Sequence, residues 1–371
     1  MKMRRRRFTL GLIIVGFSLL LLAGCGDKGV EPSTSSLQRI LNDALTRHQL
    51  PGIAGTIIHS NSIETAVAGV RRLGSPNRIA ANDLFHLGSN TKAITATIIA
   101  RLVENGQLTW ESTPLSVFPE LADSIQTEYR DITLAQILSH RAGIPSFSTV
   151  EEFLTLPDFV GTPLQQRRAF TAWLLHRAPA TAPGTYLYSN AGYGVAAAMA
   201  ERVAGESWES MLGSRLLSPL GINGEVGWPA AGDPDQPWGH WLEDGLLRPH
   251  DPHDEYQLPS IIAPAGDVSM SIGDYARFVQ LHLRGLRGRA ELLSAATFRR
   301  LHTPTGYYAF GWAVVSVDGV ASSSHDGSAG TFYVLVVIQP SRDLAVAVVT
   351  NAGHDEAAMA VSEAALALLK L

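Results

Sequence analysis

The stretch Gly88-Ser89-Asn90-Thr91-Lys92 stands at the head of a run, Thr91 to Glu104, whose apolar residues recur with the period of a helix. Three residues make nearly one helical turn, so Ser89 and Lys92 are expected to share a face. A hydroxyl beside an amine is a nucleophile beside its proton acceptor, provided that burial or nearby cations keep the amine neutral. The free N–H groups at the helix start also suit a developing oxyanion. This spacing is common by chance, and the alternative is an ordinary helix start with a solvated lysine.

The composition is that of an ordinary globular protein. The 371 residues are 46% hydrophobic and 17% charged, with a formal net charge of −5. The length allows one large domain or two closely joined domains, and no surplus of basic residues indicates nucleic-acid binding. Lys92 is the only lysine between Lys28 and the last two residues, which sets it apart from a field of solvated surface lysines.

Residues 1–24 have the pattern of a lipoprotein signal peptide. Cationic residues precede an apolar run, Phe8 to Ala23, that is short for a membrane-spanning helix. Leu22-Ala23-Gly24-Cys25 then resembles a bacterial lipobox, and Arg5 to Phe8 loosely resembles a twin-arginine signal, so either export route remains open. We therefore predict lipidation at Cys25 and a flexible tether over residues 25–36. The alternatives are an uncleaved anchor and a plain signal peptide with an incidental cysteine.

Cys25 is the only cysteine in the chain. Once it is acylated, no cysteine remains for a disulfide, a metal site or a thiol nucleophile. We expect a lipid-anchored protein of the bacterial cell envelope, on its periplasmic or extracellular face. Gly26 after the cysteine favours the outer membrane if the host is Gram-negative. Cell fractionation of the Cys25→Ser variant checks this, because that variant should be released or left unprocessed.

Residues 37–371, which follow the predicted tether, predict an α+β fold. Helices are expected at 37–48, 91–104, 132–140, 163–176, 190–205, 208–216, 272–284 and 356–369. Strands are expected at 52–59, 63–70, 310–317, 320–324, 331–338 and 344–350, with a hairpin at 240–249. Tight connections imply antiparallel pairing. We predict an antiparallel sheet formed by both chain ends and flanked by helices (37–105 and 225–371), an all-helical inserted lobe (106–224), and a cleft between them.

Two further stretches carry candidate chemistry. Tyr188-Ser189-Asn190 follows a Pro-Gly break and precedes a helix, so that Tyr188 and Asn190 can face a cleft, or Ser189 or Asn190 can simply cap the helix. His325-Asp326-Gly327-Ser328 lies between two strand-like runs, where glycine allows close approach of a ligand to the backbone. The alternative for this stretch is a plain hairpin turn.

Taken in order, Ser89-x-x-Lys92, Tyr188-x-Asn190 and His325-x-Gly327 resemble the serine hydrolases of the class C β-lactamase type. This group includes D-alanyl-D-alanine carboxypeptidases, D-aminopeptidases and family VIII carboxylesterases. The resemblance runs from about Leu37 to Leu371. Further similar stretches lie at 138–145, 263–267 and 348–351.

The resemblance implies a role for each motif residue. Ser89 is the nucleophile, Lys92 helps to take its proton, and Tyr188 acts as general base in acylation and activates water in deacylation. Asn190 hydrogen-bonds Lys92 and a substrate amide. His325, Asp326 and Gly327 bind substrate, and the backbone N–H groups of Ser89 and Ser328 form the oxyanion hole. The mechanism needs no metal and no cofactor.

The third motif departs from the pattern, because most β-lactamases and penicillin-binding proteins of this type have Lys-Thr-Gly there. A histidine at this position argues against an efficient β-lactamase and favours an esterase or a D-amino-acid peptidase acting on a small or peptide-like substrate, which a cell wall can supply. An imidazole at His325 predicts an ionisation in the activity between about pH 5.5 and 7.5. The alternative function is a non-catalytic penicillin-binding-like lipoprotein that binds a ligand or partner.

Two side chains and one cluster need an interpretation. Asp326 stands where relatives have a hydroxyl that binds a ligand carboxylate, so it either faces the cleft and disfavours anionic substrates, or turns away and caps the turn near Ser328 or Gly330. His140 is expected to pack a turn at the lobe junction. The His250 to Glu255 cluster looks like zinc ligands but is expected to be a solvated loop.

Overall fold

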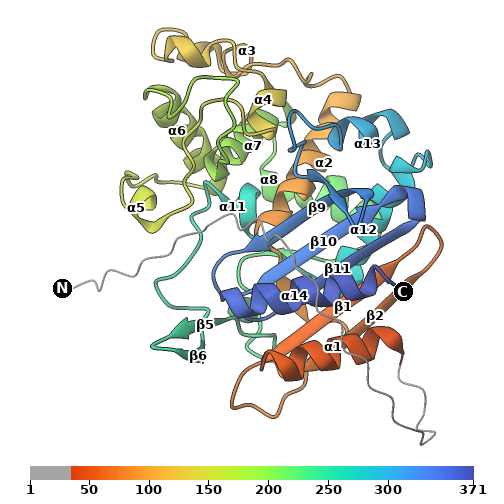
Figure 1. Cartoon of the computed structure of the whole chain (residues 1–371). Coiled ribbons are helices and arrows are strands. Elements are labelled where there is room, and N and C mark those ends of the chain that lie inside the picture. The colour runs from red at the N-terminus through yellow and green to blue at the C-terminus, as the bar shows by residue number, and fades with distance from the viewer. Residues whose placement is uncertain (1–34) are drawn as a thin grey trace, which may run out of the picture.

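A computed structural model describes residues 35–371 (Figure 1). Its main feature is a six-stranded antiparallel sheet. In spatial order the strands are β2 (Ile63–Gly69), β1 (Gly52–Ile58), β11 (Leu344–Thr350), β10 (Tyr333–Gln339), β9 (Val320–Ser328) and β8 (Ala313–Val317). The N-terminal hairpin therefore pairs with the last strand of the chain, which confirms the predicted sheet formed by both chain ends.

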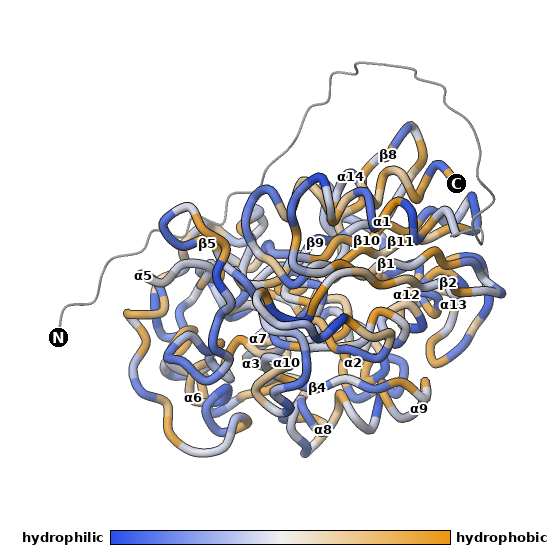
Figure 2. The backbone as a smooth tube through the Cα atoms, turned by 90° about the horizontal axis from the view of Figure 1, so that it is seen from below, coloured by the Kyte–Doolittle hydropathy of each residue, from blue (hydrophilic) through white to orange (hydrophobic). Residues whose placement is uncertain are grey.

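Helices cover both faces of this sheet (Figure 1). α1 (Ser36–Arg47) and α14 (Asp355–Leu368) pack on one face, and α12 (Ile272–Leu286) packs on the other with α13 (Ala295–Leu301) beside it. Every residue of the central strand β11 is buried, as expected for a strand of Ala and Val held between two helical layers. Hydrophobic segments accordingly gather along the sheet strands in Figure 2.

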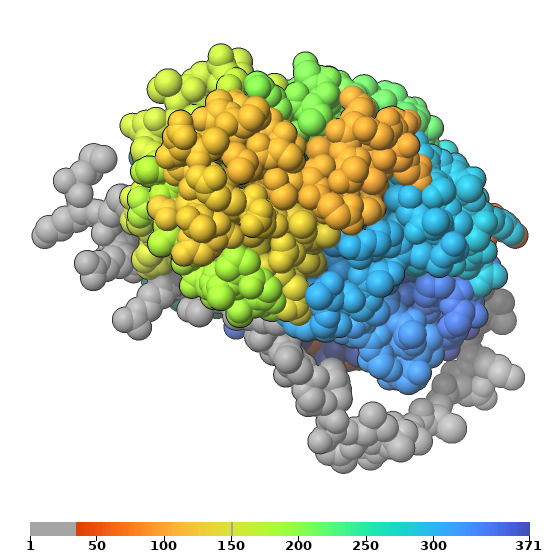
Figure 3. All heavy atoms as spheres, turned by 90° about the horizontal axis from the view of Figure 1, so that it is seen from above, coloured from red at the N-terminus to blue at the C-terminus, as the bar shows by residue number. Residues whose placement is uncertain are grey.

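The structured elements between residues 106 and 224 are helical. They are α3 (Pro114–Val117), α4 (Leu134–Leu138), α5 (Val150–Phe153), α6 (Pro163–Leu175), α7 (Asn190–Ala204), α8 (Trp208–Leu212) and α9 (Ser218–Leu220), with short helical turns between them. Seen from above, these yellow and green segments lie directly against the blue C-terminal part of the chain (Figure 3).

The helix α2 (Thr91–Glu104) begins and ends where the sequence predicts. Eleven of its residues are buried, so it crosses the interior between the helical part and the sheet, as a helix with little polar surface should. Its buried hydroxyls find partners: Thr95 Oγ1 donates to Pro264 O at 2.7 Å, and Thr97 Oγ1 donates to Ala93 O at 2.8 Å. These bonds remove the cost of burying polar groups.

Two features differ from the sequence-based expectation. A small second sheet joins β3 (Leu84–His86), β7 (Val268–Ser271) and β4 (Glu225–Val226), and these strands are too short for their periodicity to be noticed. The strand β9 continues through Ser328, so the third motif lies within a strand, and the hairpin-turn alternative is wrong. The hairpin β5 (His240–Glu243) and β6 (Leu246–Pro249) occurs as predicted.

The signal peptide, the lipidation at Cys25 and most of the tether lie outside the described residues, and they stay predictions. Within residues 35–371, no helix combines the length and the apolarity needed to cross a bilayer.

Candidate active site

The turn that carries Ser89 lies directly against β9. It is a single 3₁₀ turn, η1 (Gly88–Asn90), that leads into α2. Gly88 has φ of 49°, and a Cβ there would lie 2.4 Å from Ser328 N. A Cβ on Gly327 would lie 2.9 Å from Ser89 N. Only glycine fits at either position. The N–H groups of Ser89 and Ser328, which are expected to hold an oxyanion, lie at this close contact.

The Ser89 hydroxyl has two side-chain partners. Lys92 Nζ lies 3.0 Å from Ser89 Oγ, and the Tyr188 hydroxyl, from the loop before α7, donates to the same oxygen at 2.8 Å. Lys92 Nζ also donates to Asn190 Oδ1 at 2.7 Å and to Ala265 O, in α11 (Ala263–Gly266), at 2.8 Å. The first two sequence motifs, about a hundred residues apart, therefore meet at one oxygen.

The environment of Lys92 favours its neutral form. The side chain is completely buried, and this desolvation lowers its pKa well below the ordinary value of 10.5, against a smaller opposing effect of the Asp326 carboxylate. A neutral amine has two donor hydrogens and one lone pair. Asn190 Oδ1 and Ala265 O can only accept, so they take both hydrogens. The lone pair is then left for Ser89, whose hydroxyl can donate.

Tyr188 is held over Lys92 by aromatic packing. Its ring centroid lies 4.7 Å from Lys92 Nζ and 4.4 Å from the ring of His140. Burial raises the pKa of Tyr188 above 10, so the phenol stays protonated and donates to Ser89. The resemblance implied a general-base role for Tyr188, whereas in this geometry Lys92 is the group placed to accept the proton. His140 is itself buried and accepts from the Ser189 N–H at 3.1 Å through Nδ1, which supports the expectation of a packing role at the lobe junction.

His325 faces the site but keeps no free nitrogen. Its Nδ1 lies 2.5 Å from the Asp326 carbonyl, which can only accept, so Nδ1 carries the hydrogen. Nε2 then accepts from the Tyr308 hydroxyl at 2.8 Å. Burial lowers the pKa of His325 to about 4. The expected ionisation between about pH 5.5 and 7.5 is therefore wrong for this residue, because a fully enclosed imidazole loses the hydration that its cation needs.

The exposed Asp326 alternates to the other side of β9 from His325 and Gly327. Its Oδ2 accepts from the Tyr333 hydroxyl at 3.3 Å. The turn-capping alternative is wrong, since Ser328 Oγ accepts the Gly330 N–H at 2.9 Å instead. The carboxylate still acts on the site: it raises the pKa of Tyr188 as a secondary contribution to burial.

Two site residues were not predicted from the sequence. Ala265 contributes only its backbone carbonyl, which leaves no side-chain signal, although it lies in a stretch recognised as similar to the family. Tyr308 pins His325, and nothing in its local sequence marks it, because the contact crosses from the strand β9 to the loop before β8.

The His250 to Glu255 segment is a loop, as expected, in which Asp251, His253 and Glu255 are exposed, but His250 itself is not solvated. His250 is buried against Trp228, Trp241 and Tyr256, and its Nε2 lies 2.9 Å from Asp254 Oδ1. Among residues 35–371, no three His, Cys, Asp or Glu side chains are grouped so as to hold a metal ion.

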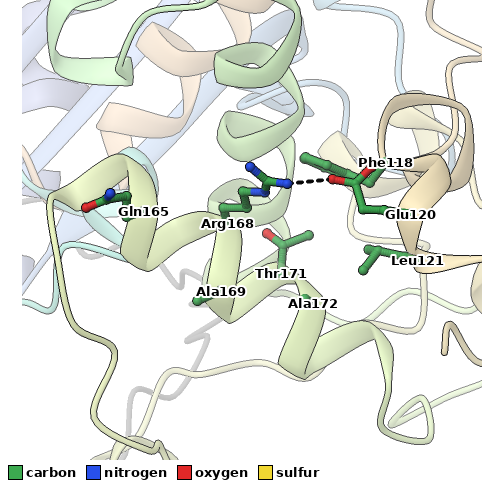
Figure 4. A pocket seen from close by; sticks show the side chains of 8 residues that line it. All are labelled: Phe118, Glu120, Leu121, Gln165, Arg168, Ala169, Thr171 and Ala172. Atoms are coloured by element: carbon green, nitrogen blue, oxygen red, sulfur yellow. Dashed lines mark hydrogen bonds and ion pairs between the residues drawn. The ribbon is translucent and has the colours of Figure 1, made fainter.

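A surface hollow of about 360 Å³ lies apart from the motif residues, between α6 and the segment that follows α3 (Figure 4). Its lining includes Phe118, Leu121 and Thr171, and the Arg168–Glu120 ion pair at 2.8 Å spans it. None of the three sequence motifs contributes to this hollow.

Comparison with known proteins identifies relatives of this chain and of its fold. The chain is 26% identical over 329 residues to "Penicillin-binding protein 4" of Amycolatopsis lactamdurans, covering 84% of each chain. It is 28% identical over 372 residues to "Unguisins hydrolase ungD" of Aspergillus violaceofuscus, covering 88% of this chain and 63% of that relative. The fold is similar to that of the octameric penicillin-binding protein homologue from Pyrococcus abyssi, with a TM-score of 0.73, 23% identity, and coverage of 90% of this chain and 76% of that one.

The model of the Beta-lactamase family matches residues 37–370, which is nearly all of the chain after the predicted tether. The relatives include penicillin-binding proteins and β-lactamases, so the likeness identifies a lineage of serine hydrolases and leaves the substrate open. On the span of this match, the chain belongs to the Beta-lactamase family.

Proposed function

We propose that the protein is a serine hydrolase that forms an acyl-enzyme on Ser89 from an ester or a peptide-like amide. The single observation that carries this proposal is the position of the Ser89 hydroxyl, which is hydrogen-bonded at once to a buried lysine and to a half-buried tyrosine. A plain structural serine needs neither partner. Burying a lysine costs free energy unless its surroundings replace the hydration that it loses. This contact also speaks against the non-catalytic alternative.

The electrostatics divide the work between the two partners. Lys92, neutral and with its lone pair towards Ser89, takes the hydroxyl proton as Oγ bonds to the substrate carbonyl carbon. The resulting oxyanion is stabilised by the N–H groups of Ser89 and Ser328. When the tetrahedral intermediate collapses, the proton held on Lys92 passes to the leaving group, and Tyr188 donates a hydrogen bond there. In the second half of the reaction, water attacks the acyl carbon and gives its proton to Lys92. The acid leaves, and Ser89 Oγ takes the proton back.

The edge of β9 offers a place for an extended substrate. β8 pairs with β9 only as far as Ser324, and no other described strand covers the outer edge of residues 325–328. Peptide-like chains bind such edges by adding a strand. Asp326, exposed beside this edge, adds a negative charge that favours neutral or cationic substrates over anionic ones.

A substrate panel tests the proposal. The purified protein should hydrolyse short-chain p-nitrophenyl esters or D-amino-acid amides faster than a D-Ala-D-Ala peptide or a chromogenic cephalosporin. Ser89→Ala should lower kcat by at least about 10³-fold with an unchanged circular dichroism spectrum. Asp326→Thr should improve the anionic substrates more than the neutral ester. An Ser89→Ala variant that keeps its activity would overturn the proposed function; faster hydrolysis of the cephalosporin would overturn only the preference.

A further inference from the structure

The segment Pro145 to Phe147 is hydrogen-bonded to the second motif through each of its three residues. The Asn190 N–H donates to Ser146 O at 2.8 Å, and Asn190 Nδ2 donates to Phe147 O at 2.8 Å. Ser189 Oγ donates to Pro145 O at 2.6 Å, and the Ser146 hydroxyl donates back to Tyr188 O. The orientation of the Asn190 amide therefore depends on where this segment places the Phe147 carbonyl.

Phe147 holds that carbonyl in place from an unfavourable backbone conformation. Its φ is 46°, in the left-handed region that a bulky side chain rarely adopts. The ring is buried against Phe153, Phe170 and Trp173, with ring centroids 5.8 to 6.3 Å away. This packing fixes the side chain, but it leaves the peptide groups on either side of Phe147 in need of a partner.

Glu152 in α5 supplies that partner. Its Oε1 accepts the Phe147 N–H at 3.0 Å, and its Oε2 accepts the N–H groups of Ser148 at 2.7 Å and Thr149 at 3.1 Å. Three consecutive amides pointing at one carboxylate form a compact anion-holding turn. In the part of the chain that the structure describes, no cation pairs with Glu152. Its carboxylate therefore binds these three backbone N–H groups.

A plain helix cap explains only part of this arrangement. Thr149 Oγ1 accepts the Glu152 N–H at 3.3 Å while Glu152 accepts the Thr149 N–H, which is the reciprocal pair of a capping box. The bonds to Phe147 and Ser148 lie outside the box and extend to the residue whose carbonyl holds Asn190. They connect the α5 carboxylate to the active site.

We propose that Glu152 is a positioning residue that fixes the amide of Asn190 through Phe147, so that Asn190 presents its oxygen, and not its nitrogen, to Lys92. The inference rests on the proposed function of the Ser89 site. With Phe147 O in place, Asn190 Nδ2 has its acceptor and Oδ1 faces Lys92 Nζ at 2.7 Å. If that carbonyl moves, the amide can flip and point Nδ2 at the lysine.

A flipped amide has a specific chemical consequence. The Nδ2 hydrogens would take the lone pair of the neutral Lys92, which is then no longer directed at Ser89. The protonated form of Lys92 would lose an acceptor and face a donor, so its pKa would fall further. Losing Glu152 should therefore slow acylation and move the acid limb of the pH profile to lower pH.

The test compares Glu152→Gln with the matched control Glu151→Gln in the full-length protein. The glutamine is isosteric but replaces one acceptor oxygen with a donor, so the three amides cannot all be satisfied. Glu151 is exposed on the same helix, away from these contacts. We expect Glu152→Gln to lower kcat/KM about tenfold, with the acid limb shifted down in pH. Glu151→Gln should match the wild type.

A double-mutant cycle separates positioning from general loosening of the fold. In an Asn190→Ala background there is no amide to orient, so adding Glu152→Gln should cost less than about twofold. The same tenfold loss in that background, or a Glu152→Gln enzyme with an unshifted pH profile, would overturn the inference. The rate at which a fluorophosphonate probe labels Ser89 gives the same comparison if substrate turnover is slow. A wild-type protein that neither turns over substrate nor labels at Ser89 refutes the proposed function itself, which is a distinct outcome.

Discussion

At the scale of single residues, the site is built from shifted protonation equilibria. Burial lowers the pKa of Lys92 and raises that of Tyr188, which separates a base from a hydrogen-bond donor around one hydroxyl. The resemblance leads one to expect a lysine at the position of His325, and His325 lies there as a ring whose Nε2 accepts from the Tyr308 hydroxyl. The site thus holds no permanent cation at the third motif, which fits a substrate without a carboxylate there.

This protonation pattern predicts the pH dependence of kcat/KM. Activity should rise with pH through one ionisation, that of Lys92, at a midpoint well below 10.5, because only the neutral amine accepts the Ser89 proton. His325→Gln should change the height of the profile and leave that midpoint in place, since the imidazole is already neutral above about pH 4. A step between pH 5.5 and 7.5 that disappears in His325→Gln would contradict the buried state of this ring.

At the scale of elements, a buried polar chain ties α2, α12, α13 and β9 together behind the site. Thr97 Oγ1 donates to Ala93 O, so it accepts from His282 Nε2 at 3.1 Å, and His282 Nδ1 then accepts from His302 Nε2 at 2.9 Å. His302 Nδ1 accepts from Ser323 at 2.8 Å. Burial favours the neutral form of both rings, and with both rings neutral each hydrogen in this chain has one direction.

This chain predicts that acid destabilises the fold. Burial lowers the pKa of His282 to about 3, and that of His302 well below 6.5. The unfolded chain therefore binds more protons, and the stability is complete above about pH 6.5 and lost as the pH falls towards the folded-state values. Below pH 6, each ring should lower the free energy of unfolding by about 1.4 kcal/mol for every unit by which the pH falls. Urea titrations between pH 7 and pH 4.5 measure this slope.

Two variants assign the slope to the buried chain. His282→Gln keeps a donor and an acceptor but cannot titrate, so its stability should fall less steeply with acid. His253→Gln changes an exposed ring and should leave the slope of the wild type unchanged. Equal slopes in all three proteins would show that these buried rings are not the source of the acid sensitivity.

The elements also show how far the sequence alone could lead. Periodicity places α2, α7 and β11 to within a residue, because long runs with a single period leave little ambiguity. The strands β3 and β7 are too short to show a period. The predicted strand 320–324 stops short of the observed end of β9 at Ser328, because a His-Asp-Gly run resembles a turn. The hydrogen bonds that keep Ser328 in the strand come from β10, far along the chain.

At the scale of the whole molecule, the site exists only where three parts of the chain meet. Ser89 and Lys92 precede the helical segment, Tyr188 belongs to it, and β9 follows it. Arg141 joins the parts beside the site by donating to Gly184 O at 2.8 Å and to Thr305 O at 2.9 Å. The order of the motifs indicated which residues belong together. The distances between them and the contribution of Glu152 depend on tertiary packing, which leaves no local pattern in the sequence.

The most direct test of the central claim is the mass of the protein after reaction with a fluorophosphonate probe, followed by peptide mapping. We expect one adduct, on Ser89, formed quickly in the wild type, slowly in Lys92→Arg, whose guanidinium cannot accept a proton, and not at all in Ser89→Ala. An adduct on another residue, or equal labelling of the Ser89→Ala variant, would contradict the claim that Ser89 is the activated nucleophile of this protein.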